Sequence, residues 1–146
     1  MKIKTIILTF LFLIFYTNSF AGKLKIKISN IKEKKGAIHY GIYNSPNDFP
    51  DEKGKIIGGY IEVSEVLKNG LIIQNLDEAY YAVAIFHDKN SNNEFDSFLA
   101  IPTERYGFSR NAPVFLGPPK FEDASVFVGA SQEIELNIEL RWKKEF

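Results

Sequence analysis

The chain has 146 residues, of which 45% are hydrophobic, 14% aromatic and 25% charged, and its 18 basic residues balance its 18 acidic ones. A chain of this length is typical of one domain, and the balanced charge gives no basic surface for nucleic acid. Because the sequence contains no cysteine, it excludes disulfides, thiolate metal sites, cysteine nucleophiles and lipid anchors attached to cysteine.

The first residues have the form of an export signal. Two lysines precede the apolar run 6–16, and small or polar residues lead from there to Ala21, which is the order found in a cleavable signal peptide. The apolar run is about half as long as the roughly 20 residues that a membrane-spanning helix needs. We therefore predict a signal peptide at 1–21 with cleavage after Ala21, and a single domain at 22–146. The product is expected to be periplasmic or secreted, with no stable membrane anchor after cleavage.

Most of the remaining chain has the pattern of β-strands. Apolar and polar residues alternate in 24–28, 38–42 and 134–140, which is typical of strands with one face in a core. His39 then falls on the face opposite to the core-facing side chains of its strand. The uncharged run 80–86 indicates a strand that is covered on both faces.

Shorter signals lie between these strands. Residues 56–63 are expected to form a strand whose two adjacent glycines mark a bulge or bend, and residues 71–73 a short buried strand. A polar stretch with two prolines and a glycine at 44–55 indicates a loop, and one helical turn fits 64–68. The total is about seven strands.

The expected pairing follows from the turns between strands. The turn at 33–36 predicts that the first two strands form a hairpin, and residues 125–128 are expected to pair with 134–140 across the next turn. Many short strands with little helical periodicity predict an all-β fold, an antiparallel β-sandwich.

The strand 80–86 is followed directly by a polar segment with the spacing of a calcium loop. Oxygen-bearing side chains occupy loop positions one, three, five and nine, and the carbonyl at position seven adds another oxygen. Calcium is therefore the one candidate cofactor that the sequence offers. The candidate ligands are Asp88, Asn90, Asn92, Glu94 and Asp96.

The segment departs from a calcium loop at two positions. Position six, usually glycine, is Asn93, which tolerates a left-handed backbone, and position twelve, usually glutamate, is Leu99. Affinity then falls in the weak range of about 0.1 to 1 mM unless a distant carboxylate completes the shell. The alternative is a polar hairpin loop whose Asn and Asp side chains cap their own backbone. The candidates for the distant carboxylate are Glu104, Glu122 and Asp123.

A long irregular segment follows at 101–124, with four prolines and two glycines. Ordered loops of this length are uncommon and are often functional. Its core-type side chains are expected to fold over one end of the sandwich as a plug, and these are Tyr106, Phe108, Phe115, Leu116 and Phe121. The candidate surface for a ligand or partner, either an extracytoplasmic protein or a glycan, consists of Glu104, Arg105, Tyr106, Phe108, Ser109 and Arg110.

Three ordered motifs carry a resemblance to a known family. They are His-Asp-x-Asn-x-Asn at 87–92, Pro-x-Glu-x-Tyr-Gly-Phe-Ser at 102–109 and Gly-Pro-Pro-x-Phe-Glu-Asp-Ala at 117–124. The chain resembles the secreted bacterial family called domain of unknown function 2141. The resemblance implies a small exported β-sandwich, transthyretin-like or immunoglobulin-like, without an established biochemical role. The chain differs at Asn93, where similar chains have glycine, and at Arg110, where they tend to have asparagine.

Three classes of function follow. The first is an exported, non-enzymatic binding or structural module of unknown biological role, in which a weak calcium site fixes the long loop. The second is a cell-envelope hydrolase that uses carboxylates of the long loop, with Glu104, Glu122, Asp123 and His87 as acid and base candidates. The third is association with a membrane surface through exposed aromatic side chains.

Two observations from the sequence decide which of these three classes of function it supports best. The sequence has no nucleophile elbow, no histidine motif for metal catalysis and no glycine-rich phosphate loop, and His87 is expected to be structural. Removal of the signal leaves 16 basic against 18 acidic residues, a net charge of −2, which opposes attraction to anionic lipid. The sequence therefore favours the binding or structural module.

Overall fold

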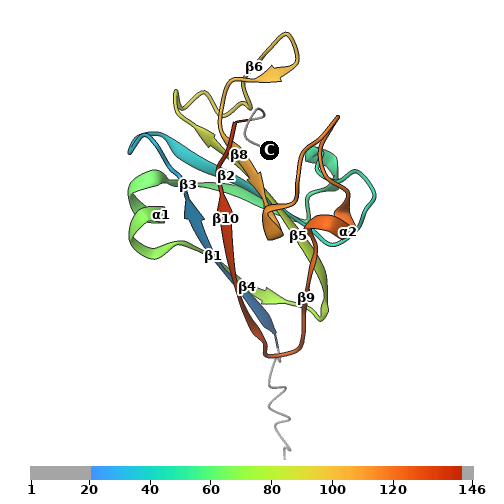
Figure 1. Ribbon diagram of the computed structural model, residues 1–146. Helices are drawn as coiled ribbons and strands as arrows, with labels where there is room; N and C mark the ends of the chain where they lie inside the picture. Colours follow the sequence, from blue (N-terminus) through green and yellow to red (C-terminus); the bar gives the residue numbers. More distant parts are fainter. Residues whose placement is uncertain (1–20, 143–146) are drawn as a thin grey trace, which may run out of the picture.

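The structure is a computed structural model that describes residues 21–142 (Figure 1). Apart from Ala21, the predicted signal peptide lies outside the described residues. The predicted all-β fold is confirmed, because most of the regular structure is strand. The ten strands of the described part are β1 (Gly22–Ser29), β2 (Ala37–Tyr43), β3 (Ile57–Glu62), β4 (Leu71–Leu76), β5 (Ala79–Asp88), β6 (Ser97–Phe98), β7 (Ile101–Pro102), β8 (Tyr106–Phe108), β9 (Val126–Val128) and β10 (Glu133–Glu139).

The strands form two main sheets and a small hairpin. One sheet has the order β10-β1-β4, and the larger one has the order β3-β2-β5-β8, with β9 paired to β5 beside that path. Strands β6 and β7 pair only with each other. The helices of the described part are η1 (Glu52–Gly54), α1 (Val63–Asn69), η2 (Ser109–Asn111) and α2 (Phe121–Ala124).

The predicted helical turn near 64–68 is confirmed by α1, which buries Val63 and Val66 in the core. The helix ends at Gly70, which has a φ of 70°, a conformation that glycine adopts without steric cost. Within residues 21–142, the search for a helix with the length and apolar character to cross a membrane found none.

The strand β1 lies in the middle of its sheet. It runs parallel to β10 and antiparallel to β4. Its outward lysines form ion pairs with the glutamates of β10, and one of these joins Lys25 Nζ to Glu133 Oε1 at 3.2 Å. Exposed pairs of this kind contribute about 0–1 kcal/mol each, so the sheet depends mainly on its buried face.

Two predicted strand pairings are wrong. The first two strands do not form a hairpin, because β1 and β2 lie in different sheets. Strand β9 pairs with β5 rather than with β10, whose partner is β1. The reason is that an alternating pattern determines which face of a strand is buried but carries no information about its neighbour. The expected bulge is also absent from the described β2–β3 ladder, in which Gly58 and Gly59 pair in regular register with Gly41 and Tyr40.

The core lies between the two sheets, in a sandwich arrangement. Each buried Leu, Ile or Val contributes roughly 1.5–3 kcal/mol by leaving water. The β1–β4–β10 sheet contributes Leu24, Ile26, Leu71, Ile73 and Ile138, and the larger sheet contributes Ile38, Ile42, Val83 and Ile85.

A second apolar cluster covers part of the outer face of the larger sheet, where the long segment folds back. The predicted plug is confirmed for Tyr106, Phe108 and Phe121, which are buried there. It is wrong for Phe115 and Leu116, which remain 85% and 90% exposed. These two residues lie between Pro113 and a Gly-Pro-Pro sequence, and this turn projects away from the sheet (Figure 1).

Candidate functional site

A row of aromatic side chains crosses the outer face of the larger sheet. The strand register places His39 opposite Tyr60 on β3 and Phe86 on β5, and Phe86 opposite Tyr106 on β8. The ring of His39 stacks on that of Phe86, with centroids 4.7 Å apart and planes at 11°. The predicted orientation of His39, away from the sandwich core, is confirmed.

The next row on the same face consists of small residues. Gly41 lies opposite Gly58 on β3 and Ala84 on β5, and Ala84 lies opposite Phe108 on β8. Residues paired across neighbouring strands present their side chains to the same face. The row of small residues therefore forms a depression beside the aromatic row.

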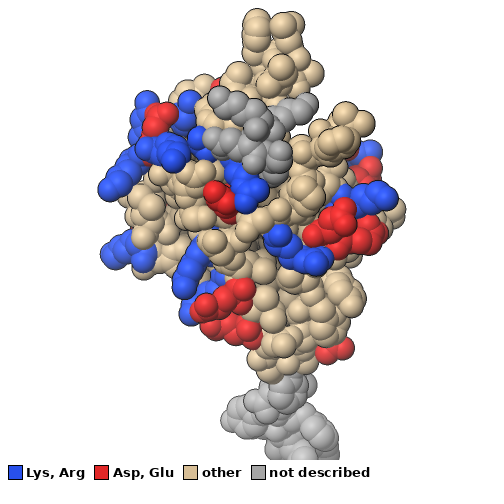
Figure 2. Space-filling model, viewed as in Figure 1, with Lys and Arg blue, Asp and Glu red and all other residues tan. Residues whose placement is uncertain are grey.

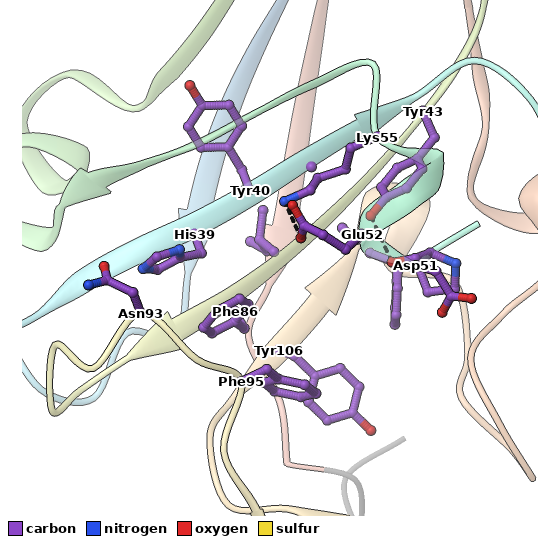
Figure 3. A pocket seen from close by; sticks show the side chains of 15 residues that line it. His39, Tyr40, Tyr43, Asp51, Glu52, Lys55, Phe86, Asn93, Phe95 and Tyr106 are labelled. Atoms are coloured by element: carbon purple, nitrogen blue, oxygen red, sulfur yellow. Dashed lines mark hydrogen bonds and ion pairs between the residues drawn. The ribbon is translucent and has the colours of Figure 1, made fainter. Parts of the chain in front are cut away.

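A pocket of about 370 Å³ occupies this depression (Figure 3). Gly41 and Ala84 form its floor. Phe86, Phe95 and Tyr106 stand on one side of it, where the ring centroids of Phe86 and Phe95 are 5.1 Å apart and those of Phe95 and Tyr106 are 5.5 Å apart. Small-molecule sites in proteins typically enclose roughly 300–1,000 Å³, so the pocket has room for a small ligand.

A charged wall closes another side of the pocket (Figure 3). It comes from the loop before β3, where Nζ of Lys55 pairs with Oε2 of Glu52 at 2.5 Å. The stem of Lys55 lies against the floor, since a Cβ added to Gly41 would lie 2.6 Å from Cδ of Lys55. The glycine is therefore needed for the close approach of this side chain, and a larger residue would displace it.

Tyr43 joins the charged wall to the aromatic cluster. Its hydroxyl donates a hydrogen bond of 2.7 Å to the carbonyl of Pro50. Burial raises the pKa of Tyr43 to about 12, and the negative charges of Glu52 and Asp51 add to this effect. The phenol therefore stays neutral at physiological pH and acts as a fixed hydrogen-bond donor.

The predicted calcium loop begins at the end of β5 and borders the pocket. Asp88 is buried, and its two carboxylate oxygens accept the backbone N–H groups of Asn92 at 3.2 Å and Asn93 at 2.8 Å. Oδ1 of Asn90 accepts the N–H of Asn92 at 3.2 Å, and Oδ1 of Asn92 accepts that of Glu94 at 2.9 Å. Alternate side chains of the loop thus cap its own backbone. Asn93 has a φ of 62°, as expected for position six.

Three predicted ligands also meet at the closing end of the loop. The amide nitrogens of Asn90 and Asn92 donate to Oδ2 and Oδ1 of Asp96 at 2.8 and 3.0 Å. The fifth predicted ligand, Glu94, enters these bonds through its backbone N–H. The side chains at positions one, three, five and nine are therefore linked in one network, as the spacing predicts for a wrapped loop.

Glu104 fastens both ends of this loop. It is 2% exposed, and its carboxylate accepts the N–H of Lys89 at 3.1 Å and that of Asp96 at 3.2 Å. Burial raises the pKa of Glu104, the two N–H groups oppose this shift, and the nearby carboxylates of Asp96 and Asp88 add to it. Of the three distant carboxylates named from the sequence, Glu104 is the one that these bonds join to the loop.

The loop and the pocket share a wall. Asn93 and Phe95 of the loop line the pocket. Nε2 of His39 lies 3.3 Å from Oδ2 of Asp88 and has no hydrogen-bond partner among the described residues. Gly36, with a φ of 74°, brings the preceding turn against the Asp88 carbonyl, which a Cβ there would meet at 2.1 Å. A change in the loop that moves Asn93 or Phe95 therefore changes the shape of the pocket.

The described part of the chain has no side chains already arranged as the ligands of a metal ion. No group of three or more His, Asp or Glu side chains in residues 21–142 is arranged to hold a metal ion. Asp88, Asp96 and Glu104 accept N–H groups as described above. Each of their carboxylates has about four lone-pair sites, so these bonds leave acceptor capacity on all three.

The predicted ligand or partner surface is mostly interior. Ser109 is buried, and its Oγ accepts the N–H of Val83 at 2.8 Å and donates to the carbonyl of Ala124. Arg105 donates to the carbonyl of Leu140 at 3.2 Å. The five buried members of the predicted surface are Glu104, Arg105, Tyr106, Phe108 and Ser109. Only Arg110 is exposed, and Tyr106 and Phe108 line the pocket.

The acid and base candidates are not brought together at the pocket. His87 is buried, and its Nε2 donates to the carbonyl of Lys35 at 2.8 Å. Glu122 and Asp123 lie on α2. None of these residues, nor Glu104, lines the pocket.

Sequence reasoning missed the residues that form the pocket floor and its charged wall. A usable signal was the order His-Tyr-Gly-Ile-Tyr at 39–43, where a ring, a glycine and a second ring occupy positions 39, 41 and 43, on the face opposite to Tyr40 and Ile42. A small residue between two rings on one face of a strand indicates a depression. The position of Lys55 above it depends on the fold of the preceding loop and had no such signal.

Comparison with known proteins bears on the family alone. A family model described as "uncharacterized protein conserved in bacteria (DUF2141)" matches residues 26–135, which is well over half of the chain. No curated protein and no solved structure gives a significant match.

Proposed function

The chain belongs to the DUF2141 family, and we propose that it is an exported, non-enzymatic binding module whose ligand occupies the pocket on the outer face of the larger sheet. The observation that carries this proposal is the row of small residues, Gly58, Gly41 and Ala84, beside a row of aromatic ones. The stem of Lys55 lies against Gly41 and Gly58 and covers part of this depression. The space that remains beside the aromatic rings is the pocket, which has room for a ligand.

The lining favours one sugar unit of a glycan. Aromatic side chains from Phe86, Phe95 and Tyr106 offer apolar surface, and the charged wall of Glu52 and Lys55 offers an acceptor and a donor. Ligand sites of this kind combine apolar walls with a few placed polar groups. A glycan is also a ligand that an exported protein meets outside the cytoplasm.

A non-enzymatic role is supported by the state of the titratable groups. Nε2 of His39 is fully buried toward Asp88, and Glu52 is paired with Lys55. An acid and a base with free access to a ligand are needed for glycosidic cleavage. The two carboxylates that line the pocket, Asp51 and Glu52, are adjacent in sequence and come from one wall rather than from opposite walls.

The test compares two lysines of one loop. Lys53 pairs with Asp48 at 2.6 Å, as Lys55 pairs with Glu52, but only Lys55 lines the pocket. Ligand-observed NMR with N-acetylglucosamine oligosaccharides and neutral hexose disaccharides is expected to show binding to the native chain. Lys55→Met should reduce affinity about tenfold and Lys53→Met should leave it unchanged. Equal effects of the two variants, or no saturation transfer from any saccharide, would contradict the proposal.

We propose as a second function that the loop 88–96 binds calcium and thereby fixes the wall formed by Asn93 and Phe95. The supporting observation is that Glu104 is buried against both ends of the loop, together with the carboxylates of Asp88 and Asp96. Calcium takes six to eight oxygen ligands, and the loop offers carboxylate, amide and carbonyl oxygens. Binding requires modest turning of Asn90 and Asn92, whose amide nitrogens now face Asp96.

A further inference from the structure

Two turns at one end of the molecule present apolar side chains to solvent. The first apolar turn, residues 97–103, contains β6 and β7, and the second apolar turn, residues 112–119, precedes α2. Both project from the end of the sandwich opposite to the start of β1 (Figure 1). The two turns are distant in sequence, so their common direction is a property of the fold.

These turns hold the most exposed large apolar side chains of the described residues 21–142. Leu116 is 90% exposed, Phe115 85%, Leu99 81% and Phe98 69%. Isolated exposed apolar residues are ordinary, but here two adjacent pairs lie at the tips of two projections. Moving apolar side chains of this size out of water is favourable.

Both apolar turns are free of charged residues. Residues 97–103 and 112–119 contain no Lys, Arg, Asp or Glu, whereas a quarter of the whole chain is charged. Figure 2 shows both projections without coloured charged groups, and shows charged groups over the body of the same face. The charge pattern fits an apolar environment around the tips and water around the body.

The backbone of the first apolar turn keeps Leu99 at the tip against local preference. Leu99 and Ala100 have φ values of 49° and 62°, in a two-residue hairpin turn where Asn-Gly is the favoured sequence. Its base is fixed by the N–H of Thr103, which donates to the carbonyl of Asp96 at 2.9 Å. Residues held in unfavourable backbone regions are often functional.

We propose that the two apolar turns insert into the interface of a neutral phospholipid bilayer and hold the domain at a membrane surface. A convex tip offers no groove to a ligand, but it buries its whole apolar surface when it enters the boundary between headgroups and acyl chains. The mature net charge of −2 gives no attraction to anionic lipid. The driving force is therefore burial of Phe98, Leu99, Phe115 and Leu116, and the proposal is independent of calcium and of the pocket.

Co-sedimentation of the chain beginning at Gly22 with vesicles of phosphatidylcholine alone, and with vesicles that also contain phosphatidylglycerol, tests this proposal, in chelator and at low and high salt. The native chain is expected to bind at both salt concentrations. The paired variants Phe98→Ser with Leu99→Ser, and Phe115→Ser with Leu116→Ser, should each weaken partitioning tenfold or more. As a second readout, the emission of the Phe98→Trp variant should shift further to shorter wavelength on addition of vesicles than that of the native chain, which contains only Trp142.

The matched control is Leu67→Ser with Ile72→Ser, which removes two exposed apolar side chains from α1 and β4. This variant should partition within twofold of the native chain. Four results would overturn the proposal: no co-sedimentation of the native chain, equal losses in the control and the paired variants, binding that needs anionic lipid and disappears at high salt, or native oligomers that the paired variants disperse. Equal thermal midpoints of all variants exclude unfolding as the cause of any loss.

Discussion

The backbone N–H of Asp96 donates a hydrogen bond of 3.2 Å to the buried carboxylate of Glu104. The other oxygen of that carboxylate accepts the N–H of Lys89 at the opposite end of the loop. A single side chain from the long segment therefore holds the loop 88–96 closed. This arrangement links the loop to the pocket wall and to the base of the first apolar turn.

Calcium is expected to raise the thermal midpoint of the native chain. At a hundred times its dissociation constant it should stabilise the fold by about 2.7 kcal/mol. Asp96→Asn removes a charge while retaining the shape of the side chain, and it should abolish most of this shift. Scanning calorimetry with millimolar calcium and with chelator measures the effect.

The matched control for this experiment is Asp123→Asn, since Asp123 is an acidic residue on α2. Its calcium-induced shift should equal that of the native chain. Identical native midpoints in millimolar calcium and in chelator would remove the calcium proposal and leave the pocket proposal unaffected.

Replacement of Ser109 by alanine should destabilise the fold by about 1–3 kcal/mol. The Ser109 hydroxyl is the partner of the Val83 N–H and of the Ala124 carbonyl, and a buried N–H without a partner costs this much. Urea denaturation measures the loss, with Ser97→Ala at an exposed position as control. A change below 0.5 kcal/mol, the usual limit for surface substitutions, would show that the hydroxyl does not support β5.

The stability of the chain should fall in alkaline solution as Tyr43 ionises. Burial raises the pKa of Tyr43 in the folded chain to about 12, against 10.0 for a tyrosine in water. Because the folded state holds this proton more tightly, the contribution is fully present below pH 10 and is lost as the pH rises from 10 to 12. The maximum loss is about 2–3 kcal/mol.

Tyr43→Phe tests this expectation. It removes the hydrogen bond to Pro50 at a cost of about 0.5–1.5 kcal/mol, and its unfolding free energy should fall less steeply between pH 10 and 12. Chemical denaturation at several pH values gives both slopes. Parallel slopes for the two proteins would assign the alkaline loss to other groups.

Asn93 should accept glycine but not valine. Its φ of 62° lies in the left-handed region, where glycine is unstrained and a β-branched side chain is costly. Asn93→Gly should stay within about 0.5 kcal/mol of native stability, and Asn93→Val should lose roughly 1–2 kcal/mol. Thermal denaturation distinguishes the two, and equal midpoints would place the loop in another conformation.

The sequence predicts which face of a strand is buried more reliably than it predicts which strand lies beside it. Alternation in β1, β2 and β10 correctly identified the buried side of each strand, because burial follows the two-residue period. It gave no basis for choosing between a β1–β2 hairpin and the observed parallel pair of β1 with β10. That choice depends on contacts between residues far apart in the chain, which local patterns do not record.

The candidate site shows the same division. The alternate oxygens of the loop, the left-handed Asn93 and the outward His39 were all local features and were predicted. The burial of Ser109 and Arg105 depends on how the long segment returns to β5 and meets Leu140, so their polar character alone predicts surface exposure incorrectly. The exposure of Phe115 and Leu116 has the same cause, since composition alone does not determine where a proline-rich turn projects.

The central place of β1 has a consequence for the order of assembly. Its two neighbours are β4, from the middle of the chain, and β10, about a hundred residues further along. Until β10 has emerged from the ribosome, one edge of β1 has no partner, and pairing across such a separation is slow. The β10-β1-β4 sheet is therefore completed late, and until then the unpaired edge of β1 can pair with another chain and cause aggregation.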